Sequence, residues 1–278
     1  MEDRQGRLSD CERLRQSFGT LVNCSADDVA IQSSSSYSAA TAAANVACEA
    51  GQNIVSLGGE HTSNRFAWQQ LADDSGLRLR VAPPPCPTRP AGAWTESVLS
   101  LIDSSTAVTA VVPSFWMDGT RLDLLAVSER CREVGSALVI DGTQSVGAID
   151  FDVAAIQPDF LFCAGYKWLL CPYRLSLCYS APKYHKKGRP IEHHGWGDLG
   201  GESGRAKAMW GLPGSEDDDG RLVMGLDETA RRFDMGERSD FSSLAAACDA
   251  VSQLGEWQKH GGCGGGATAA LLSPMVNA

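Results

Sequence analysis

Short apolar stretches of strand length recur along the chain, separated by stretches with helical periodicity or strong helix propensity. The predicted strands are a short one within residues 26–31, then residues 53–57, 77–81 and 107–112, two runs that end at Asp141 and near Cys163, and residues 175–179. The predicted helices are residues 8–18, 39–50, 64–71, 95–102 and 122–134. Because strands and helices alternate from about residue 30 to residue 180, the sequence predicts an α/β fold with a mostly parallel sheet.

The regular alternation ends after residue 182, where glycine, histidine and charged residues become frequent. A short helix and turn, and then a helix over residues 242–254, are predicted before a final stretch without periodicity. The predicted organisation is an N-terminal helical segment (1–25), a core domain (26–182), an irregular loop-rich insertion (183–224), a truncated remnant leading into a small C-terminal domain (225–258) and a disordered Gly/Ala-rich tail (259–278).

The charge balance narrows the range of partners. The net charge is −10, and no run of Lys or Arg interleaves with aromatic residues, so neither nucleic acid nor an anionic membrane is expected to bind. No apolar stretch approaches the ~20 residues needed to cross a bilayer, and the N-terminus is too polar for a secretory signal. The ten cysteines show no CxxC spacing, so we expect reduced thiols, a cytoplasmic protein and no metal site.

Two apolar runs end in residues that could share a ligand. The first ends at Asp141, and after about one crossover the second leads into Lys167. The carboxyl ends of parallel strands meet at one edge of the sheet, where ligands bind. An amine and an acid placed there suit pyridoxal 5'-phosphate (PLP), because the lysine forms a Schiff base and the acid keeps the ring nitrogen protonated. From these two residues alone, the simpler interpretation is a buried ion pair or a lysine that faces water.

Three segments together resemble the class V aminotransferase family of fold-type I PLP-dependent enzymes. They are residues 141–147 (Asp-Gly-Thr-Gln-Ser-Val-Gly), 158–160 (Pro-Asp-Phe) and 164–170 (Ala-Gly-Tyr-Lys-Trp-Leu-Leu). The resemblance runs in order from about residue 10 to residue 257, and the Gly-Tyr-Lys-Trp sequence is most similar to the isopenicillin N epimerase-like branch rather than to the cysteine desulfurases. It implies the large domain of that fold, with a mixed, mostly parallel seven-stranded sheet between helices, and PLP as the cofactor.

The resemblance also implies roles for the residues around the ring of the cofactor. Lys167 would carry the cofactor and shuttle the Cα proton, and Asp141 would pair with the pyridinium nitrogen. Gln144 would hydrogen-bond the phenolate oxygen, near which Trp116 replaces a frequent asparagine, and His61 would stack on the ring. Without the resemblance, Gln144 could cap a helix, Trp116 could pack at a loop edge, and His61 could be a surface histidine.

The phosphate end of the cofactor is assigned in the same way. Ser35 and Ser36 stand where the family cradles the phosphate at a helix start, although a serine run there could equally be a helix cap and a polar turn. Tyr166 stands where desulfurases have a histidine and can still donate a hydrogen bond. Residues 232–239 resemble the segment that reaches the neighbouring subunit's cofactor, which implies a homodimer.

The segment that follows the lysine departs from the family pattern at two positions. Cys171 and Arg174 stand where Gly-Pro-Tyr-Gly is expected, and Arg174 is expected to disturb the cofactor loop. The resemblance therefore implies a PLP-dependent enzyme that acts on an amino acid or amine by Schiff-base exchange at Lys167 and Cα carbanion chemistry, through transamination, epimerisation or elimination. The alternative is a catalytically silent relative that serves as a scaffold or dimer partner.

Overall fold

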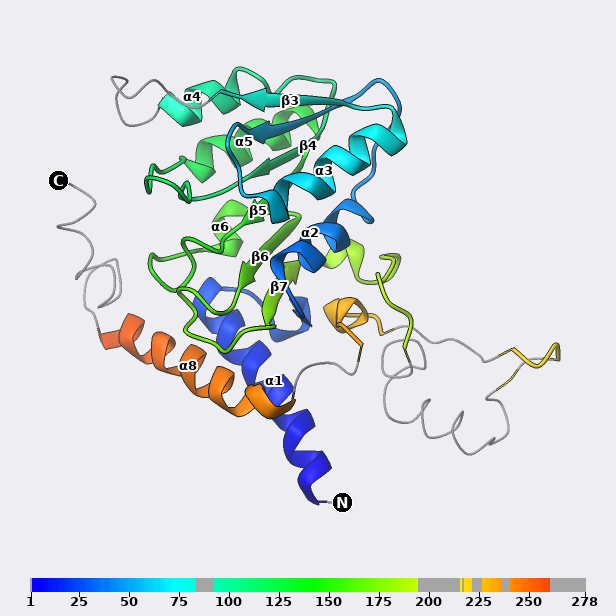
Figure 1. Cartoon of the computed structure of the whole chain (residues 1–278), viewed down its shortest axis with the longest axis vertical. Coiled ribbons are helices and arrows are strands. Elements are labelled where there is room, and N and C mark those ends of the chain that lie inside the picture. The colour runs from blue at the N-terminus through cyan, green and yellow to red at the C-terminus, as the bar shows by residue number, and fades with distance from the viewer. Residues whose placement is uncertain are drawn as a thin grey trace.

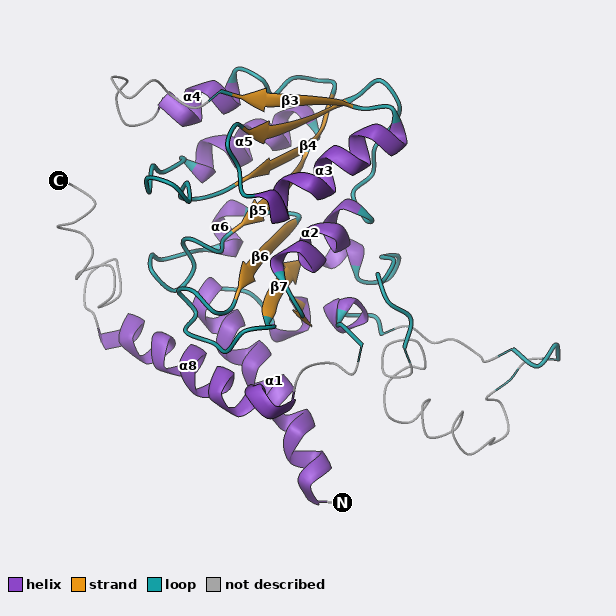
Figure 2. Ribbon diagram, viewed as in Figure 1, coloured by secondary structure: helices purple, strands orange, loops and turns teal. Residues whose placement is uncertain are grey.

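Seven strands of the described chain form a single sheet (Figure 2). The computed structural model describes residues 2–83, 93–194, 216, 218–221, 227–236 and 241–260. The strands are β1 (Val29–Gln32), β2 (Asn53–Leu57), β3 (Arg78–Ala82), β4 (Thr106–Val111), β5 (Ala137–Asp141), β6 (Phe160–Ala164) and β7 (Ser176–Ser180). Except for the edge strand β3, they are buried along almost their whole length, which explains why they read as continuous apolar runs.

The strand order places the chemistry-bearing loops together. The order is β1-β7-β6-β5-β4-β2-β3, with β7 antiparallel to both of its neighbours and every other pair parallel. This confirms the predicted mixed, mostly parallel seven-stranded sheet. The carboxyl ends of β2, β4, β5 and β6 consequently meet at one edge, where a ligand crevice is expected.

Helices cover both faces of the sheet (Figure 1). The helices of the described chain are α1 (Glu2–Val22), α2 (Ser35–Ala43), α3 (Thr62–Ser75), α4 (Ala93–Leu99), α5 (Leu124–Val134), α6 (Val153–Ile156) and α8 (Phe241–His260), with 3-10 turns η1 (Ala26–Asp28), η2 (Pro182–Tyr184) and η3 (Ala230–Phe233). One apolar cluster joins the sheet to α1, α4, α5, α6 and α8, and a second joins it to α2, α3 and η3. No helix in the described ranges is both long and apolar enough to cross a membrane.

The helix predicted over residues 39–50 has different ends. It begins earlier, because the Ser34 hydroxyl caps it by accepting from the Tyr37 N–H at 3.2 Å, so α2 starts at Ser35. It ends at Ala43, where the Asn45 amide turns outward, donates to the Arg189 carbonyl at 3.0 Å and accepts from the Arg189 N–H at 2.6 Å. Helix propensity alone favoured continuation to residue 50, and this distant partner overrides it.

The remaining elements agree with the predicted types. The predicted helices at 8–18 and 242–254 lie inside α1 and α8, and the predicted strand at 175–179 is β7. Most of the predicted insertion and the predicted tail beyond residue 260 lie outside the described residues.

A buried ion pair connects α1 to the edge of the sheet. Arg15, fully buried on α1, donates through Nη2 to Asp234 Oδ2 at 2.6 Å, and its Nη1 donates to the Val29 carbonyl. The other oxygen of Asp234 accepts from the Ile31 N–H at 2.9 Å. One arginine and one aspartate therefore hold α1, β1 and the chain after η3 in a fixed arrangement, and both charges are satisfied by several hydrogen bonds.

Replacing Arg15 with methionine should lower the free energy of unfolding by about 3–5 kcal/mol, because Asp234 would stay buried without its cation. Urea unfolding followed by circular dichroism measures this change. Arg13→Met is the matched control on the same helix, since the Arg13 side chain is 57% exposed and its pair with Asp10 is worth about 1 kcal/mol or less. Equal losses in the two variants would show that the buried pair contributes nothing special.

Candidate cofactor site

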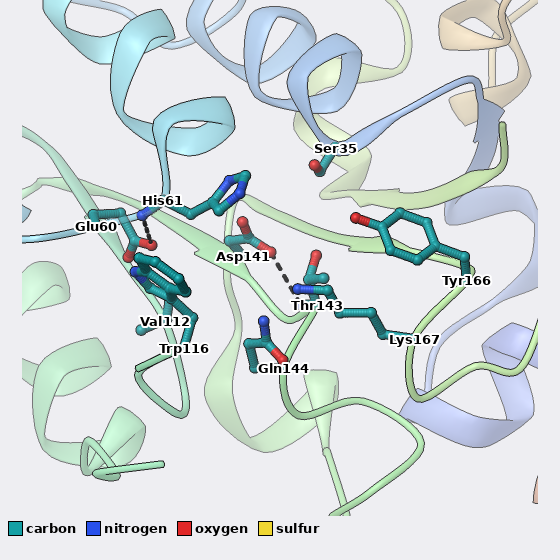
Figure 3. A pocket seen from close by; sticks show the side chains of 10 residues that line it. All are labelled: Ser35, Glu60, His61, Val112, Trp116, Asp141, Thr143, Gln144, Tyr166 and Lys167. Carbon is teal, nitrogen blue, oxygen red and sulfur yellow. Dashed lines mark hydrogen bonds between the residues drawn. The ribbon is translucent and has the colours of Figure 1, made fainter. Parts of the chain in front are cut away.

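A cavity lies at the sheet edge where the carboxyl ends of the parallel strands meet (Figure 3). Its lining residues are Ser35, Glu60, His61, Val112, Trp116, Asp141, Thr143, Gln144, Tyr166 and Lys167. Of the eight residues predicted from sequence, only Ser36 is not in the lining. The side chains come from the start of α2 and from the loops after β2, β4, β5 and β6, segments far apart in the chain.

Asp141 is the last residue of β5 and is buried, with only 7% of its surface exposed. Burial raises the pKa of its carboxyl above the ordinary value, against the hydrogen bonds from Thr143 and the charges of His61 and Lys167, which lower it. Its Oδ1 accepts from the Thr143 N–H at 3.0 Å. A cation placed beside a buried acid stabilises the ionised form of that acid. A protonated ring nitrogen would be such a cation.

The loop that carries Lys167 is fixed to the loop that follows Asp141. The Thr143 hydroxyl accepts from the Ala164 N–H at 3.0 Å, which joins the end of β5 to the end of β6. Gly147 has a positive φ of 96°, and a Cβ on it would lie 2.3 Å from the Trp168 carbonyl oxygen. The two loops therefore touch backbone to backbone beside Lys167, and glycine is required at that contact.

The start of α2 supplies the polar end of the cavity. Figure 3 shows the hydroxyls of Ser35 and Tyr166 directed into the same region of the cavity. The first N–H groups of a helix, together with such hydroxyls, favour an anion. Ser36 instead lies exposed, with its hydroxyl 3.0 Å from that of Ser34. The expected phosphate contact of Ser36 therefore has no support from this arrangement, whereas that of Ser35 does.

Two aromatic rings border the cavity near the start of α3. The His61 and Trp116 rings meet edge to face, with centroids 5.7 Å apart and planes at 89°. His61 Nδ1 accepts from the Ser63 N–H at 3.3 Å, and Trp116 Nε1 donates to the Gly59 carbonyl at 2.8 Å. His61 thus caps α3 while its ring borders the cavity, and the ring contact and the indole hydrogen bond hold Trp116 against the same loop.

Glu60 is a cavity residue that the sequence did not single out. Only 6% of it is exposed, and its Oε1 accepts from the His61 N–H at 2.6 Å. Burial, and then the charge of Asp141, raise the pKa of its carboxyl to about 7. A single glutamate in a glycine-rich loop has no periodic pattern that would mark it as buried. The available signal in the sequence was its position in the loop after β2, at the edge where a ligand crevice is expected.

The polar groups of the cavity fit PLP. Lys167 offers an amine for the aldehyde, Asp141 offers a buried acid for the ring nitrogen, and Ser35 with the N-terminus of α2 offers donors for the phosphate. Gln144 and His61 line the space between these groups, as the resemblance to the family implied. Within the described part of the chain, no group of three His, Cys, Asp or Glu residues could hold a metal ion.

Comparisons with known proteins agree with the fold and with the expected cofactor. Isopenicillin N epimerase of Streptomyces clavuligerus is 27% identical over 169 residues, which are 60% of this chain and 42% of the epimerase. A probable cysteine desulfurase of Methanothermobacter thermautotrophicus is 23% identical over 256 residues, 90% of this chain and 58% of that protein. The chain therefore spans less than two thirds of the length of either relative.

A solved structure shares the fold. It is a variant of C-DES with glycine covalently linked to its PLP cofactor, and it matches with a TM-score of 0.74 and 18% identity, over 92% of this chain and 62% of that one. The family model for class-V aminotransferases matches residues 5–197. The family match supports pyridoxal 5'-phosphate as the cofactor of this chain. Since the family model covers most of the sequence, the chain belongs to the class-V aminotransferase family.

Proposed function

We propose that the protein is a PLP-dependent enzyme that acts on an amino acid or amine. The observation that carries this proposal is the presence of Lys167 and the buried Asp141 in one cavity, held there by two loops that interlock through Thr143 and Gly147. When bound, PLP supplies a carbon that joins reversibly to amines and a ring that accepts electrons from the bond being broken. The reaction is transamination, epimerisation or elimination.

The residues of the chain would divide the work by position. Lys167 Nζ would bind the cofactor, leave it when a substrate amine arrives, and then take or return the proton at the substrate Cα. Asp141 would supply the negative charge that keeps the ring nitrogen protonated. Ser35 and the start of α2 would bind the phosphate, and the His61 ring would cover one face of the cofactor ring. Tyr166 would add a phosphate contact, whereas the predicted contact of Ser36 is not retained because Ser36 lies outside the cavity lining. The proposed assembly is a homodimer.

Lys167→Ala should abolish the absorbance of the lysine-bound cofactor and weaken PLP binding at least about tenfold, because the covalent attachment is lost. Borohydride reduction of the wild-type protein followed by peptide mass spectrometry should find the cofactor on the peptide that contains Lys167. Lys186→Ala, which changes an exposed lysine paired with Glu228, should leave both results unchanged. Retention of the absorbance in Lys167→Ala would reject the proposed role.

The backbone after Lys167 favours a second candidate, a catalytically silent family member that acts as a scaffold or dimer partner. Leu170 and Arg174 have positive φ values of 56° and 66°. Residues other than glycine rarely adopt this conformation, because their Cβ atom is too close to the backbone. Arg174 is exposed and is not among the cavity-lining residues, so its effect on the cofactor loop is through backbone strain rather than through its charge. Tight PLP binding without turnover of any amino acid in a broad panel, together with stable hetero-dimers, would favour this candidate over the enzyme.

Arg174→Gly should raise the free energy of unfolding by about 0.5–1 kcal/mol. Removing Cβ relieves strain of about 1–2 kcal/mol, and the greater freedom of glycine in the unfolded chain takes back part of that gain. Chemical denaturation at constant protein concentration measures the difference. Arg174→Ala keeps Cβ and should show no such gain, so an equal effect in the two variants would contradict the strain explanation.

A further inference from the structure

We propose that Glu60 is a proton-holding residue of the cofactor cavity, and that a ligand in the cavity binds more tightly when Glu60 carries its proton. The proposal rests on the proposed function, because it takes this cavity as the place where the cofactor binds. Glu60 would act as a positioning residue through His61 and Asp141, and it takes no part in the bond-making steps.

The hydrogen bonding of Glu60 leaves one oxygen available for the proton. Oε1 accepts from the His61 N–H at 2.6 Å, so this oxygen already serves as an acceptor. Oε2 is buried and makes no well-formed hydrogen bond to the described residues, and the Asn64 side chain favours the ionised form less than any other group around the carboxyl. An ionised carboxylate would leave a buried negative oxygen without a partner, which is costly, whereas a protonated carboxyl places a neutral hydroxyl there.

The charges around Glu60 come from three parts of the fold. Asp141 at the end of β5 opposes its ionisation, and Arg65 on α3 favours it. The charges of His61 and Lys167 act on Asp141, where they favour the ionised carboxylate. Burial is the largest influence and outweighs the His61 N–H, the Arg65 charge and the Asn64 side chain, so the pKa of Glu60 rises to about 7.

Two buried carboxyls in one cavity do not both ionise readily, because each negative charge opposes the other. Asp141 must be ionised in order to pair with a cationic ring nitrogen, and the proton is then best held by Glu60. The hydrogen bonds agree with an ionised Asp141 and a protonated Glu60. Asp141 accepts from the Thr143 N–H, whereas Glu60 Oε2 accepts no well-formed hydrogen bond within the described structure.

A bound ligand strengthens the preference. Glu60 lines the cavity and is 6% exposed, so a ligand that displaces water there removes the remaining solvent from beside the carboxyl and raises the pKa of Glu60 again. A group whose pKa is higher in the bound state takes up a proton on binding. The contribution of Glu60 to affinity is therefore fully present below about pH 7, and it is lost as the pH rises through the pKa of the bound state.

Pyridoxine 5'-phosphate is the probe for the experiment, since it has an alcohol in place of the aldehyde and cannot attach to Lys167. Isothermal titration calorimetry from pH 6 to pH 9, in two buffers of different ionisation enthalpy, gives the affinity and the number of protons taken up. Glu60→Gln keeps the shape and the acceptor for the His61 N–H but cannot ionise. Glu129→Gln, the same change at an exposed position on α5, is the matched control.

We expect the dissociation constant of the wild type, divided by that of Glu60→Gln, to rise above pH 7 by up to about tenfold per pH unit. Glu60→Gln should take up fewer protons on binding than the wild type. The difference should be a fraction of a proton, and it should be largest at pH values between the pKa of Glu60 in the free protein and its pKa in the complex. Glu129→Gln should follow the wild type at every pH. Equal affinity ratios and equal proton uptake across the whole range would overturn the proposal, as would failure of the wild type to bind the probe.

A second measurement, infrared spectroscopy, uses the wild-type protein alone and needs neither a ligand nor a variant that folds. The infrared spectrum of the wild-type protein should contain a protonated carboxyl band at pH 6 that disappears with a midpoint near pH 7. Disappearance below pH 5 would overturn the proposal even if Glu60→Gln did not fold. Attachment of PLP at Lys167 with no such band would reject the role of Glu60 alone, whereas loss of attachment in the wild type would reject the proposed function itself.

Discussion

The contact between the loop after β5 and the loop after β6 is the constraint on which the site depends. A hydrogen bond from the Ala164 N–H to the Thr143 hydroxyl and a backbone contact at Gly147 fix the separation of the two loops. The sheet alone brings the strand ends to one edge, but strand ends leave the loops free to diverge. Because both contacts act on the backbone of the loop that carries Lys167, the main-chain position of Lys167 relative to Asp141 is fixed by one buried hydroxyl and one backbone contact. That is the kind of support that a reacting amine needs.

Buried charge is treated in two different ways in the molecule. At the edge of the sheet, Arg15 and Asp234 neutralise one another, and the surrounding backbone groups satisfy them further. In the cavity, Asp141 and Glu60 are both acids, and one oxygen of Glu60 lacks a partner within the described residues. The first arrangement serves stability, whereas the second leaves a demand for a cation and a proton. A cavity with such an unmet demand is a binding site in physical terms, because a ligand can supply what the fold does not.

The parts of the structure that the sequence predicted are those governed by local pattern. Buried strands read as apolar runs, Asp141 ends one of them, and Lys167 lies in the loop after another, so both the sheet and this pair were accessible from periodicity and chain order. The end of α2 was not, because Asn45 bonds to Arg189 across 144 positions. Glu60 was missed for a similar reason, since its burial arises from packing between β2, β5 and α3. Ser35 and Ser36 were indistinguishable in the sequence, and the direction of the first turn of α2 separates them.

The cavity also separates what is common to the family from what distinguishes this chain. In the proposed function, Lys167 and Asp141 would serve every reaction branch alike, so they would not select among transamination, epimerisation and elimination. Selection requires groups that touch the substrate, and the half-exposed Trp116 and Tyr166 stand at the rim where a substrate would enter. Tyr166 stacks on Tyr173 with ring centroids 4.3 Å apart and planes at 7°, so the strained segment from Leu170 to Arg174 carries the ring that supports Tyr166. The backbone conformation after the lysine is therefore connected to the shape of the rim through the stacked rings of Tyr166 and Tyr173.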